Sequence, residues 1–261
     1  MNRLPTTFAR LKSENRAGFV TYIMAGDGET AELLDALPAA GADVIELGMP
    51  FTDPMADGPT IEAAALRALD NGMTLKGTLA LAKVFRTNHP DTPLVLMGYA
   101  NPVHHLGYAA FATAAAEAGI DGLICVDLPP EEDTELREAL AAVNISIIRL
   151  ATPTTNDDRL KAVAEGSSGF VYYVSTTGVT GTGKGAVTDV SNAVKRVQNA
   201  TGLPVAVGFG VRTPEEAAEI ASGGADAVVV GSAIVSANHD GGTKNALELV
   251  RNISAAIRAA S

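Results

Sequence analysis

Four residues with chemically useful side chains cluster in one short stretch of this sequence. Glu46 interrupts the apolar run 44–47, which has the character of a buried strand, and Thr52, Asp53 and Asp57 follow in a loop kept irregular by prolines and glycines. A carboxylate inside a buried strand is costly unless it is paired or used. Acids at a strand end and on the loop after it are typical of an active site at the carboxyl edge of a parallel sheet. A surface loop with turn aspartates is the alternative, and it fits Glu46 least well.

Two glycine-containing segments favour a phosphate site. Gly210 follows the expected strand 205–207, and Gly231 and Ser232 follow the expected strand 227–230. Glycine lets the backbone approach a ligand closely, and a short helix starting at Ser232 would offer free amides to an anion. The loops after the last two strands of a barrel commonly bind phosphate in this way. Taken singly, each glycine is more often a plain turn.

The segment Ser175–Val187 is rich in glycine and threonine. It nearly matches a P-loop, but Gly185 stands where a Ser or Thr should hold magnesium, and the helix is expected to start near Thr188, not at Lys184. These departures favour a mobile lid over a barrel mouth instead of a nucleotide site. A plain flexible connector is the alternative.

A regular alternation of strands and helices must position these residues. The near-continuous apolar runs are typical of strands covered on both faces, and they lie at Phe19–Met24, Val44–Leu47, Leu94–Met97, Leu123–Val126, Ile145–Leu150, Phe170–Val174, Val205–Val207 and Ala227–Val230. Segments of helical period lie between them, at Ala31–Ala40, Leu75–Arg86, Ala109–Ala118, Glu131–Ala142, Asp158–Ala164, Asp189–Ala200, Glu215–Ala221 and Asn245–Ala259.

Eight strands alternating with eight helices predict an α/β fold, a single-domain (β/α)8 TIM barrel spanning residues 1–261. We also expect an extra N-terminal helix around Phe8, a further helix near 60–69, and extended βα loops 2 and 6. Capping boxes are expected at Thr213 and at Thr155. A doubly wound open sheet is the main rival, although it usually has fewer strands or a second domain at this length.

The composition limits the range of partners and compartments. With 47% hydrophobic and 19% charged residues, the chain has ample material for a core, and its formal net charge of -11 argues against nucleic acid or an anionic membrane as a partner. A phosphorylated substrate stays compatible if backbone amides bind it. The single cysteine, Cys125, rules out an intrachain disulfide and suits a reducing cytosol. We find no apolar run long enough for a membrane span, no signal core and no metal-ligand spacing, because adjacent His104 and His105 rarely share one ligand direction.

The stretch Ile45–Ile61 resembles the signature of the tryptophan synthase α subunit family, and the resemblance extends along essentially the whole chain. Supporting segments are 99–102, 178–181, 208–211 and 230–233. The resemblance implies a (β/α)8 lyase that splits indole-3-glycerol phosphate into indole and glyceraldehyde 3-phosphate by a retro-aldol step. It implies no metal or organic cofactor in this subunit. It also implies a cytoplasmic α2β2 complex with a separate β subunit, which carries pyridoxal phosphate.

The resemblance also assigns roles to residues of this sequence. Glu46 corresponds to the family's general acid/base, and Asp57 to the acid that accepts the indole N–H; burial near the strand end would raise the pKa of Glu46. Pro50 and Asp53 are implied partner contacts, and Glu62 stands where glutamine is expected. The remaining implied site residues are Gly181, Gly210, Gly231 and Ser232 for phosphate, and Phe19, Ile124, Tyr172, Thr180 and Phe209 for the indole pocket and lid.

Two other functions stay open from the sequence. Another phosphate-handling barrel, such as an isomerase or an indole-glycerol phosphate synthase, would share the glycines of the last two strands, although the synthase would be expected to carry a lysine on a strand and no strand here does. A non-catalytic barrel that activates a partner is the other alternative, and the presence of both acids argues against it.

Overall fold

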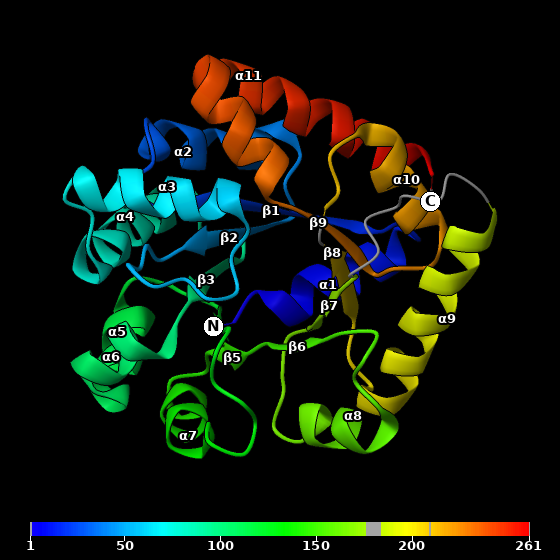
Figure 1. Cartoon of the computed structure of the whole chain (residues 1–261), viewed down its shortest axis with the longest axis horizontal. Helices are drawn as coiled ribbons and strands as arrows, with labels where there is room; N and C mark the ends of the chain where they lie inside the picture. Colours follow the sequence, from blue (N-terminus) through cyan, green and yellow to red (C-terminus); the bar gives the residue numbers. More distant parts are fainter. Residues whose placement is uncertain (1, 176–183, 209, 261) are drawn as a thin grey trace.

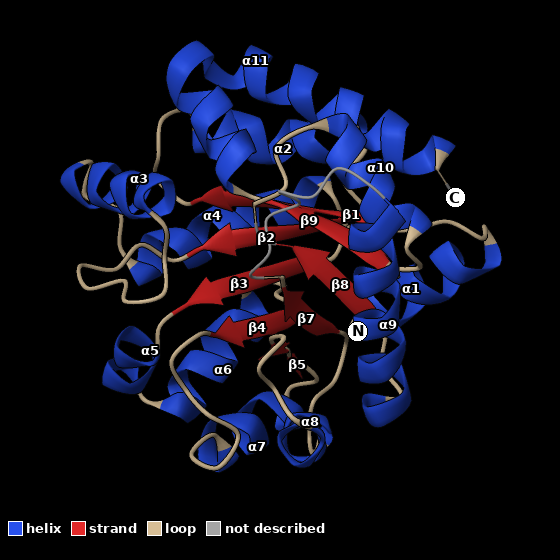
Figure 2. Ribbon diagram, turned by 45° about the vertical axis from the view of Figure 1, so that its right-hand side comes forward, coloured by secondary structure: helices blue, strands red, loops and turns tan. Residues whose placement is uncertain are grey.

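A computed structural model describes residues 2–175, 184–208 and 210–260, without the side chains of 184–189. Within these residues the strands form one parallel sheet. The strands are β1 (Gly18–Met24), β2 (Val44–Gly48), β3 (Leu94–Gly98), β4 (Gly122–Cys125), β5 (Ser146–Ile147), β6 (Arg149–Ala151), β7 (Val171–Val174), β8 (Val205–Gly208) and β9 (Ala227–Val230). Figures 1 and 2 show the helices surrounding these strands.

The sheet closes into a barrel through one interrupted strand. Its order is β5-β4-β3-β2-β1-β9-β8-β7-β6, and the two end strands, β5 and β6, are consecutive in the chain with only Ile148 between them. β5 pairs with β4 and β6 pairs with β7, so the segment 146–151 links the two ends of the sheet. The predicted (β/α)8 barrel is confirmed. The sheet has nine strands instead of the eight predicted because Ile148 divides the single strand predicted at Ile145–Leu150 into β5 and β6.

The helices follow the strands as a parallel barrel requires. They are α1 (Leu4–Ser13), α2 (Thr30–Ala40), α3 (Pro59–Asp70), α4 (Leu75–Asn88), α5 (Ala100–Leu106), α6 (Tyr108–Glu117), α7 (Thr134–Ala142), α8 (Asp157–Ala164), α9 (Lys184–Thr201), α10 (Pro214–Ser222) and α11 (Ser232–Ala259). The expected N-terminal helix and the helix near 60–69 are present as α1 and α3. The second βα connection is long because it holds the loop 49–58, α3 and α4.

Four details of the expected helices are wrong. The helix expected near Thr188 begins at Lys184, so one of the two arguments against a P-loop falls, while the argument from Gly185 stands. The N-cap of α8 is Asn156, whose side chain accepts the Arg159 N–H, and not Thr155. The helix α5 was not among those expected, and the helix that starts at Ser232 is longer than the short one expected. It runs to a break at Gly242, where φ is 72°, before continuing to Ala259. The capping box at Thr213 is confirmed.

Alternate residues of each strand face the inside of the barrel. Val20, Val44, Ile124 and Tyr172 belong to an inner cluster that also holds Leu4, Phe8 and Leu11 of α1. These three residues lie at i, i+4 and i+7 on one helix face, so α1 plugs one end of the barrel. Figure 1 shows α1 at the centre of the ring of strands. The intervening strand residues pack outward against the helices in a separate cluster.

Candidate active site

Glu46 is the only carboxyl on a barrel strand that points inward among the described residues. It lies on β2 two residues after inward-facing Val44, while Ile45 and Leu47 pack outward. Its side chain is 1% exposed, and neither carboxyl oxygen has a hydrogen-bond partner among the described residues. Burial alone raises the pKa of Glu46 to about 8. The residue is therefore protonated at neutral pH and able to donate a proton in an apolar site.

Asp57 lies on the loop after β2, half-buried. Burial raises its pKa to about 6, the negative charge of Glu62 adds to that rise, and a hydrogen bond with the Tyr99 side chain opposes it. Asp57 is thus largely ionised at neutral pH while Glu46 is protonated. Two carboxyl groups with pKa values pushed apart are the usual arrangement for separate acid and charge-stabilising roles.

Tyr22 lies near both carboxyl groups. On β1 it is the register partner of Glu46, and it faces inward with Met24 and with Ile61 and Ala64 of α3. Burial raises the pKa of Tyr22 well above its ordinary value, and the negative charges of Asp57 and Glu46 raise it further. The phenol therefore lies within electrostatic reach of both acids. Its hydroxyl occupies the space above Gly48, where a Cβ would lie 2.2 Å from it.

Phe19 does not share this position. It packs in the outer cluster between the strands and the helices. Phe19 is one residue before the inward-facing Val20 and three before Tyr22, so it points to the opposite face of β1. Because successive side chains of a strand point to opposite faces, Phe19 and Tyr22 cannot both line the barrel interior. The assignment of Phe19 to an indole pocket is therefore wrong for this structure, and Tyr22 takes its place beside Glu46.

Two other predicted pocket residues do face inward. Ile124 on β4 and Tyr172 on β7 belong to the inner cluster. Burial raises the pKa of Tyr172 well above its ordinary value, and the charge of Glu46 raises it further. The Tyr172 hydroxyl lies over Gly208 at the end of β8, where a Cβ would be 2.6 Å from it. Glu46 is thus accompanied by tyrosines from two other strands, Tyr22 and Tyr172.

The glycines of the phosphate prediction lie after β8 and β9, which are the seventh and eighth strands if β5 and β6 are taken as one. Gly210 has φ of +80°, a backbone conformation that favours glycine. Gly231 is the N-cap of α11, and a Cβ there would lie 3.2 Å from the Cβ of Tyr22. Ser232 is exposed at the first turn of α11, whose N-terminus carries free amides and the positive end of the helix dipole. Gly181, Thr180 and Phe209 lie outside the described residues.

The loop after β2 separates exposed from buried residues. Asp53 is exposed, and its carboxylate accepts a hydrogen bond of 2.6 Å from the Thr52 hydroxyl. Pro50 is buried, so it offers no surface to a partner, whereas Met55 is 82% exposed at the outer part of the loop. The burial of Pro50 contradicts the partner contact expected there.

The sequence reasoning missed Tyr22 and undervalued Tyr99. Both are tyrosines in or directly after a strand: Tyr22 lies within electrostatic reach of the two acids, and the Tyr99 hydroxyl accepts a hydrogen bond from the loop. Val20 and Tyr22 point to the same side of β1, so the direction of one would have given the other. A strand that is apolar on both faces shows no alternation from which to tell which residues point inward. Tyr99 appeared only as part of the motif 99–102, and no sequence signal links it to Ala56.

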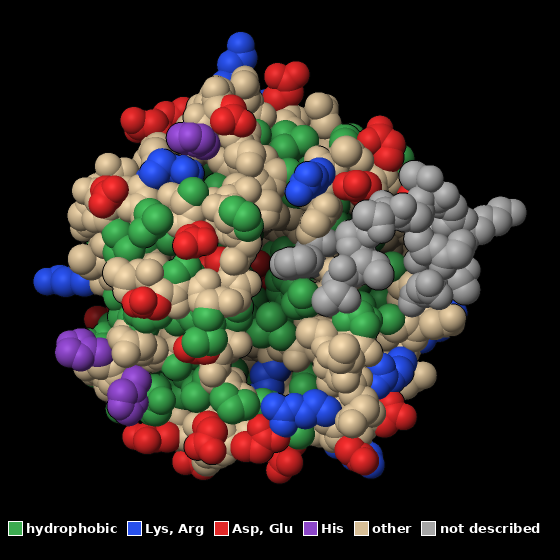
Figure 3. Space-filling view, viewed as in Figure 1, with side chains coloured by type: hydrophobic (Ala, Val, Ile, Leu, Met, Phe, Trp, Pro, Cys, Tyr) green, Lys and Arg blue, Asp and Glu red, His purple; other side chains and the backbone are tan. Residues whose placement is uncertain are grey.

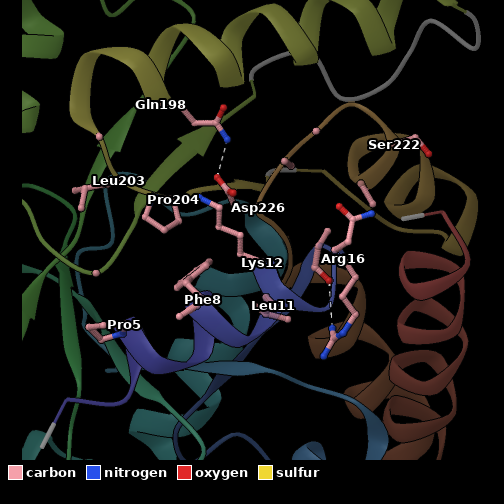
Figure 4. Close-up of a pocket in the computed structure, with 18 of the residues that line it drawn as sticks. Pro5, Phe8, Leu11, Lys12, Arg16, Gln198, Leu203, Pro204, Ser222 and Asp226 are labelled. Carbon is pink, nitrogen blue, oxygen red and sulfur yellow. Dashed lines mark hydrogen bonds between the residues drawn. The ribbon is translucent and has the colours of Figure 1, made fainter.

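A cavity of about 920 Å³ lies at the opposite end of the barrel. It is lined by α1 and by residues that precede strands, among them Ala17, Gly169, Pro204 and Asp226. Figure 4 shows Asp226 hydrogen-bonded to Gln198 there, at 2.7 Å. Glu46 and the loops described above belong to the carboxyl ends of the strands, so this cavity is separate from the site.

Figure 3 shows hydrophobic side chains lining a hollow near the centre of the face seen in Figure 1.

Neither a metal-binding cluster nor a membrane-spanning helix occurs in the described part of the chain. No three of its His, Cys, Asp and Glu side chains gather closely enough to share a metal ion. None of its helices combines the length and apolar character needed to cross a membrane. The single cysteine is buried at the end of β4, and burial raises the pKa of its thiol to about 12.

A closed parallel barrel with a buried, protonated glutamic acid and a nearby ionised aspartate at its carboxyl end defines a (β/α)8-barrel enzyme of the acid–base type. The sequence model of the tryptophan synthase alpha chain matches residues 8–259. The chain is 59% identical over 237 residues to the tryptophan synthase alpha chain of Caulobacter vibrioides strain NA1000, covering 90% of this chain and 86% of that one. It is 60% identical, with the same coverage, to the protein of that name from Caulobacter sp. strain K31.

Solved structures agree in fold. The tryptophan synthase alpha subunit from Legionella pneumophila strain Paris superposes with a TM-score of 0.91 at 35% identity, covering 98% of each chain. A chain of Mycobacterium tuberculosis tryptophan synthase superposes with a TM-score of 0.90 at 37% identity and the same coverage. The chain belongs to the tryptophan synthase alpha chain family. It is a carbon–carbon lyase that cleaves indole-3-glycerol phosphate to indole and glyceraldehyde 3-phosphate in tryptophan biosynthesis, and this confirms the activity expected from the sequence.

Proposed function

We propose that Glu46 moves the protons of the cleavage and that Asp57 stabilises the charge that develops on the indole ring. The observation that carries this proposal is the isolation of Glu46: its carboxyl is buried inside the barrel without a hydrogen-bond partner among the described residues, and its pKa is about 8. A carboxyl group without a structural partner is free to meet a substrate. Asp57, with a pKa of about 6, supplies a carboxylate on the neighbouring loop.

The chemistry adds a proton at one end of the bond that breaks and removes a proton at the other. Protonated Glu46 donates its proton to indole C3, which places positive charge on the ring, and the Asp57 carboxylate accepts a hydrogen bond from the ring N–H. The Glu46 carboxylate then takes the proton of the substrate hydroxyl as the carbon–carbon bond breaks. The bonding electrons return to the ring, the hydroxyl carbon becomes the aldehyde, and Glu46 is protonated again. Protons and electrons therefore balance over one turnover.

The substrate's two ends fit two parts of the barrel mouth. We assign the indole pocket to Ile124, Tyr172 and Tyr22, with Thr180 and Phe209 retained from the family resemblance. The phosphate is assigned to the amides around Gly210, Gly231 and Ser232, with Gly181 retained on the same basis. Support comes from the N-terminus of α11 at Ser232, since free helix amides bind anions without a basic side chain. This suits a chain with a net charge of -11.

The same proposal extends to partner, cofactor and compartment. We place the chain in the cytoplasm, as a single domain over residues 1–261 within an α2β2 complex. In that complex the β subunit binds pyridoxal phosphate, and this chain works without an organic cofactor. The exposed Met55, beside Asp53 on the loop that carries Asp57, supports a partner surface there. Met55 is a large apolar side chain that is 82% exposed, and a β chain seated on this loop would cover it.

The test is release of indole from indole-3-glycerol phosphate by the full chain, alone and with an added tryptophan synthase β chain. Wild type, Glu46→Gln, Asp57→Asn and the matched control Asp53→Asn are compared after circular dichroism has verified folding. We expect the first two variants to lose turnover and the control to keep it in the isolated chain. Wild-type turnover in both Glu46→Gln and Asp57→Asn would refute the assigned roles.

A further inference from the structure

Tyr99 contacts the loop of Asp57 in three ways. Its hydroxyl accepts the backbone N–H of Ala56 at 3.1 Å. The same hydroxyl hydrogen-bonds the side chain of Asp57. Its ring stacks on Phe51, with the ring centroids 5.4 Å apart and the planes 29° apart. A single side chain from the next βα connection thus contacts the loop 49–58, here called the catalytic loop, near its beginning and near its end.

Tyr99 is itself held rigidly. It is 3% exposed, follows β3 directly and is the N-cap of α5. The next residue, Ala100, donates its backbone N–H to the Asp127 carboxylate at the end of β4, at 2.7 Å. Tyr99 therefore fixes the loop after β2 relative to the carboxyl ends of β3 and β4. A loop without secondary structure needs such a support if its acid is to have a fixed place.

We propose that Tyr99 is a positioning residue for Asp57, holding the carboxylate in the orientation that meets the indole N–H. The inference rests on the proposed role of Asp57 and adds the group that aims it. One phenol O–H engages one lone pair of the carboxylate, which has several, so the other oxygen stays available to the substrate. The phenol oxygen accepts the Ala56 N–H at the same time, and this fixes the loop backbone beside the acid.

The hydrogen bond has a second effect, on protonation. A donor to the charged form of a carboxyl group favours that form, and the Tyr99 hydroxyl lowers the pKa of Asp57 against the rise caused by burial. Removal of the hydroxyl therefore misplaces Asp57 and also leaves more of it protonated near pH 6. A residue with only a structural role would not move the acidic limb of the pH profile.

The experiment measures indole release by the full chain between pH 5 and pH 10 for wild type, Tyr99→Phe and Tyr108→Phe. Tyr99→Phe keeps the ring that stacks on Phe51 and loses only the hydroxyl. Tyr108→Phe loses a phenol hydroxyl on α6, where the ring meets His104 edge-on and no contact with the catalytic loop is involved. We expect Tyr99→Phe to lower kcat about tenfold to hundredfold, with a smaller change in KM, and to move the acidic limb to higher pH. The control should match wild type.

Phe51→Leu keeps the test decisive if Tyr99→Phe does not fold. It leaves the hydroxyl in place, removes its stacked ring, and should move the acidic limb in the same direction by a smaller amount. Wild-type kcat and an unmoved acidic limb in the folded Tyr99→Phe variant would overturn the inference, as would an unmoved limb in Phe51→Leu if that is the variant available. Turnover in Asp57→Asn at the wild-type rate would instead refute the role of Asp57 itself, so the two failures are distinguishable.

Discussion

Tyr22 on β1 and Glu46 on β2 are register partners on adjacent parallel strands, so the phenol and the carboxyl point to the same side, the inside of the barrel. No hydrogen bond joins Glu46 to Tyr22 or to any other described residue. The pKa of Glu46 is accordingly raised by burial alone. Tyr22 contributes by keeping the carboxyl in apolar, narrow surroundings, and its own hydroxyl fits because the residue after Leu47 on β2 is glycine.

The two acids predict a bell-shaped pH dependence of turnover. The proposed roles require an ionised Asp57, whose pKa is about 6, and a protonated Glu46, whose pKa is about 8. Activity should therefore rise with pH through about 6, hold between the two values and fall through about 8. Steady-state rates of indole release from pH 5 to pH 10 measure this directly. A profile flat across that range would contradict both assignments.

Replacing Glu46 by glutamine should separate activity from stability. Turnover should fall roughly 10²–10⁴-fold, because the amide cannot shuttle a proton. At alkaline pH the variant should be more stable than wild type. The folded-state pKa of Glu46, about 8, lies above its ordinary value of 4.5, so wild type loses stability as pH rises from about 4.5 through about 8, when the buried group must ionise.

The neutral amide removes that cost. Denaturant unfolding at pH 9 should show the variant more stable than wild type, by an amount on the order of 5 kcal/mol. The difference should shrink toward the value at pH 4. Greater stability of wild type at pH 9 would mean that Glu46 has an ionic partner.

The barrel and Glu46 could be predicted from the sequence because they depend on local patterns, whereas Asp57 was selected from the loop acids by the family resemblance. Strands covered on both faces appear as apolar runs, and Glu46 stood out as the exception within one of them. The same property hid the phase of β1, which explains why Phe19 was chosen and Tyr22 was not. The link from Tyr99 to Ala56 depends on a contact between residues 43 positions apart, which no spacing rule supplies. The break at Ile148 likewise depends on how strands 4 and 7 approach the same segment.

The correction at β1 can be tested by a matched pair of aromatic replacements. Phe19→Leu removes volume from the outer cluster, so it should lower the free energy of unfolding by about 1–2 kcal/mol and leave kcat/KM near wild type. Tyr22→Leu removes the phenol beside Glu46, so it should lower kcat/KM at least tenfold. Both are measured by denaturant unfolding and by indole release. A larger loss of activity in Phe19→Leu would restore the original assignment.

Asp27 and Arg67 join the end of β1 to α3. The Arg67 guanidinium donates two hydrogen bonds to the Asp27 carboxylate, at 2.7 and 2.8 Å, and the side chain of Asp27 is buried. Asn71, one turn further, donates to the Gly26 carbonyl. Because α3 follows the loop of Asp57, the pair fixes the far end of that loop to the barrel.

Removing the arginine leaves the buried Asp27 carboxylate without its partner. Arg67→Met should therefore lower the free energy of unfolding by about 1–3 kcal/mol, since Arg67 is partly exposed. It should also raise KM for indole-3-glycerol phosphate. Arg251→Met, an exposed arginine on α11, is the matched control and should change neither quantity. An unchanged free energy of unfolding in Arg67→Met would show that the bidentate pair does not hold α3.

Glu62 stands in the first turn of α3, where the family resemblance leads us to expect glutamine. Its negative charge raises the pKa of Asp57. Glu62→Gln should therefore lower the pKa of Asp57 and extend activity to more acidic conditions. Because Glu62 is exposed and screened by solvent, the acidic limb should move by on the order of 0.3 pH unit. The shift should be larger in low salt than at high ionic strength, which distinguishes a charge effect from a repacking of the helix. Measuring both profiles with the exposed-site control Glu32→Gln completes the test, and an acidic limb that moves upward or ignores salt would show that Glu62 does not act on Asp57 through its charge.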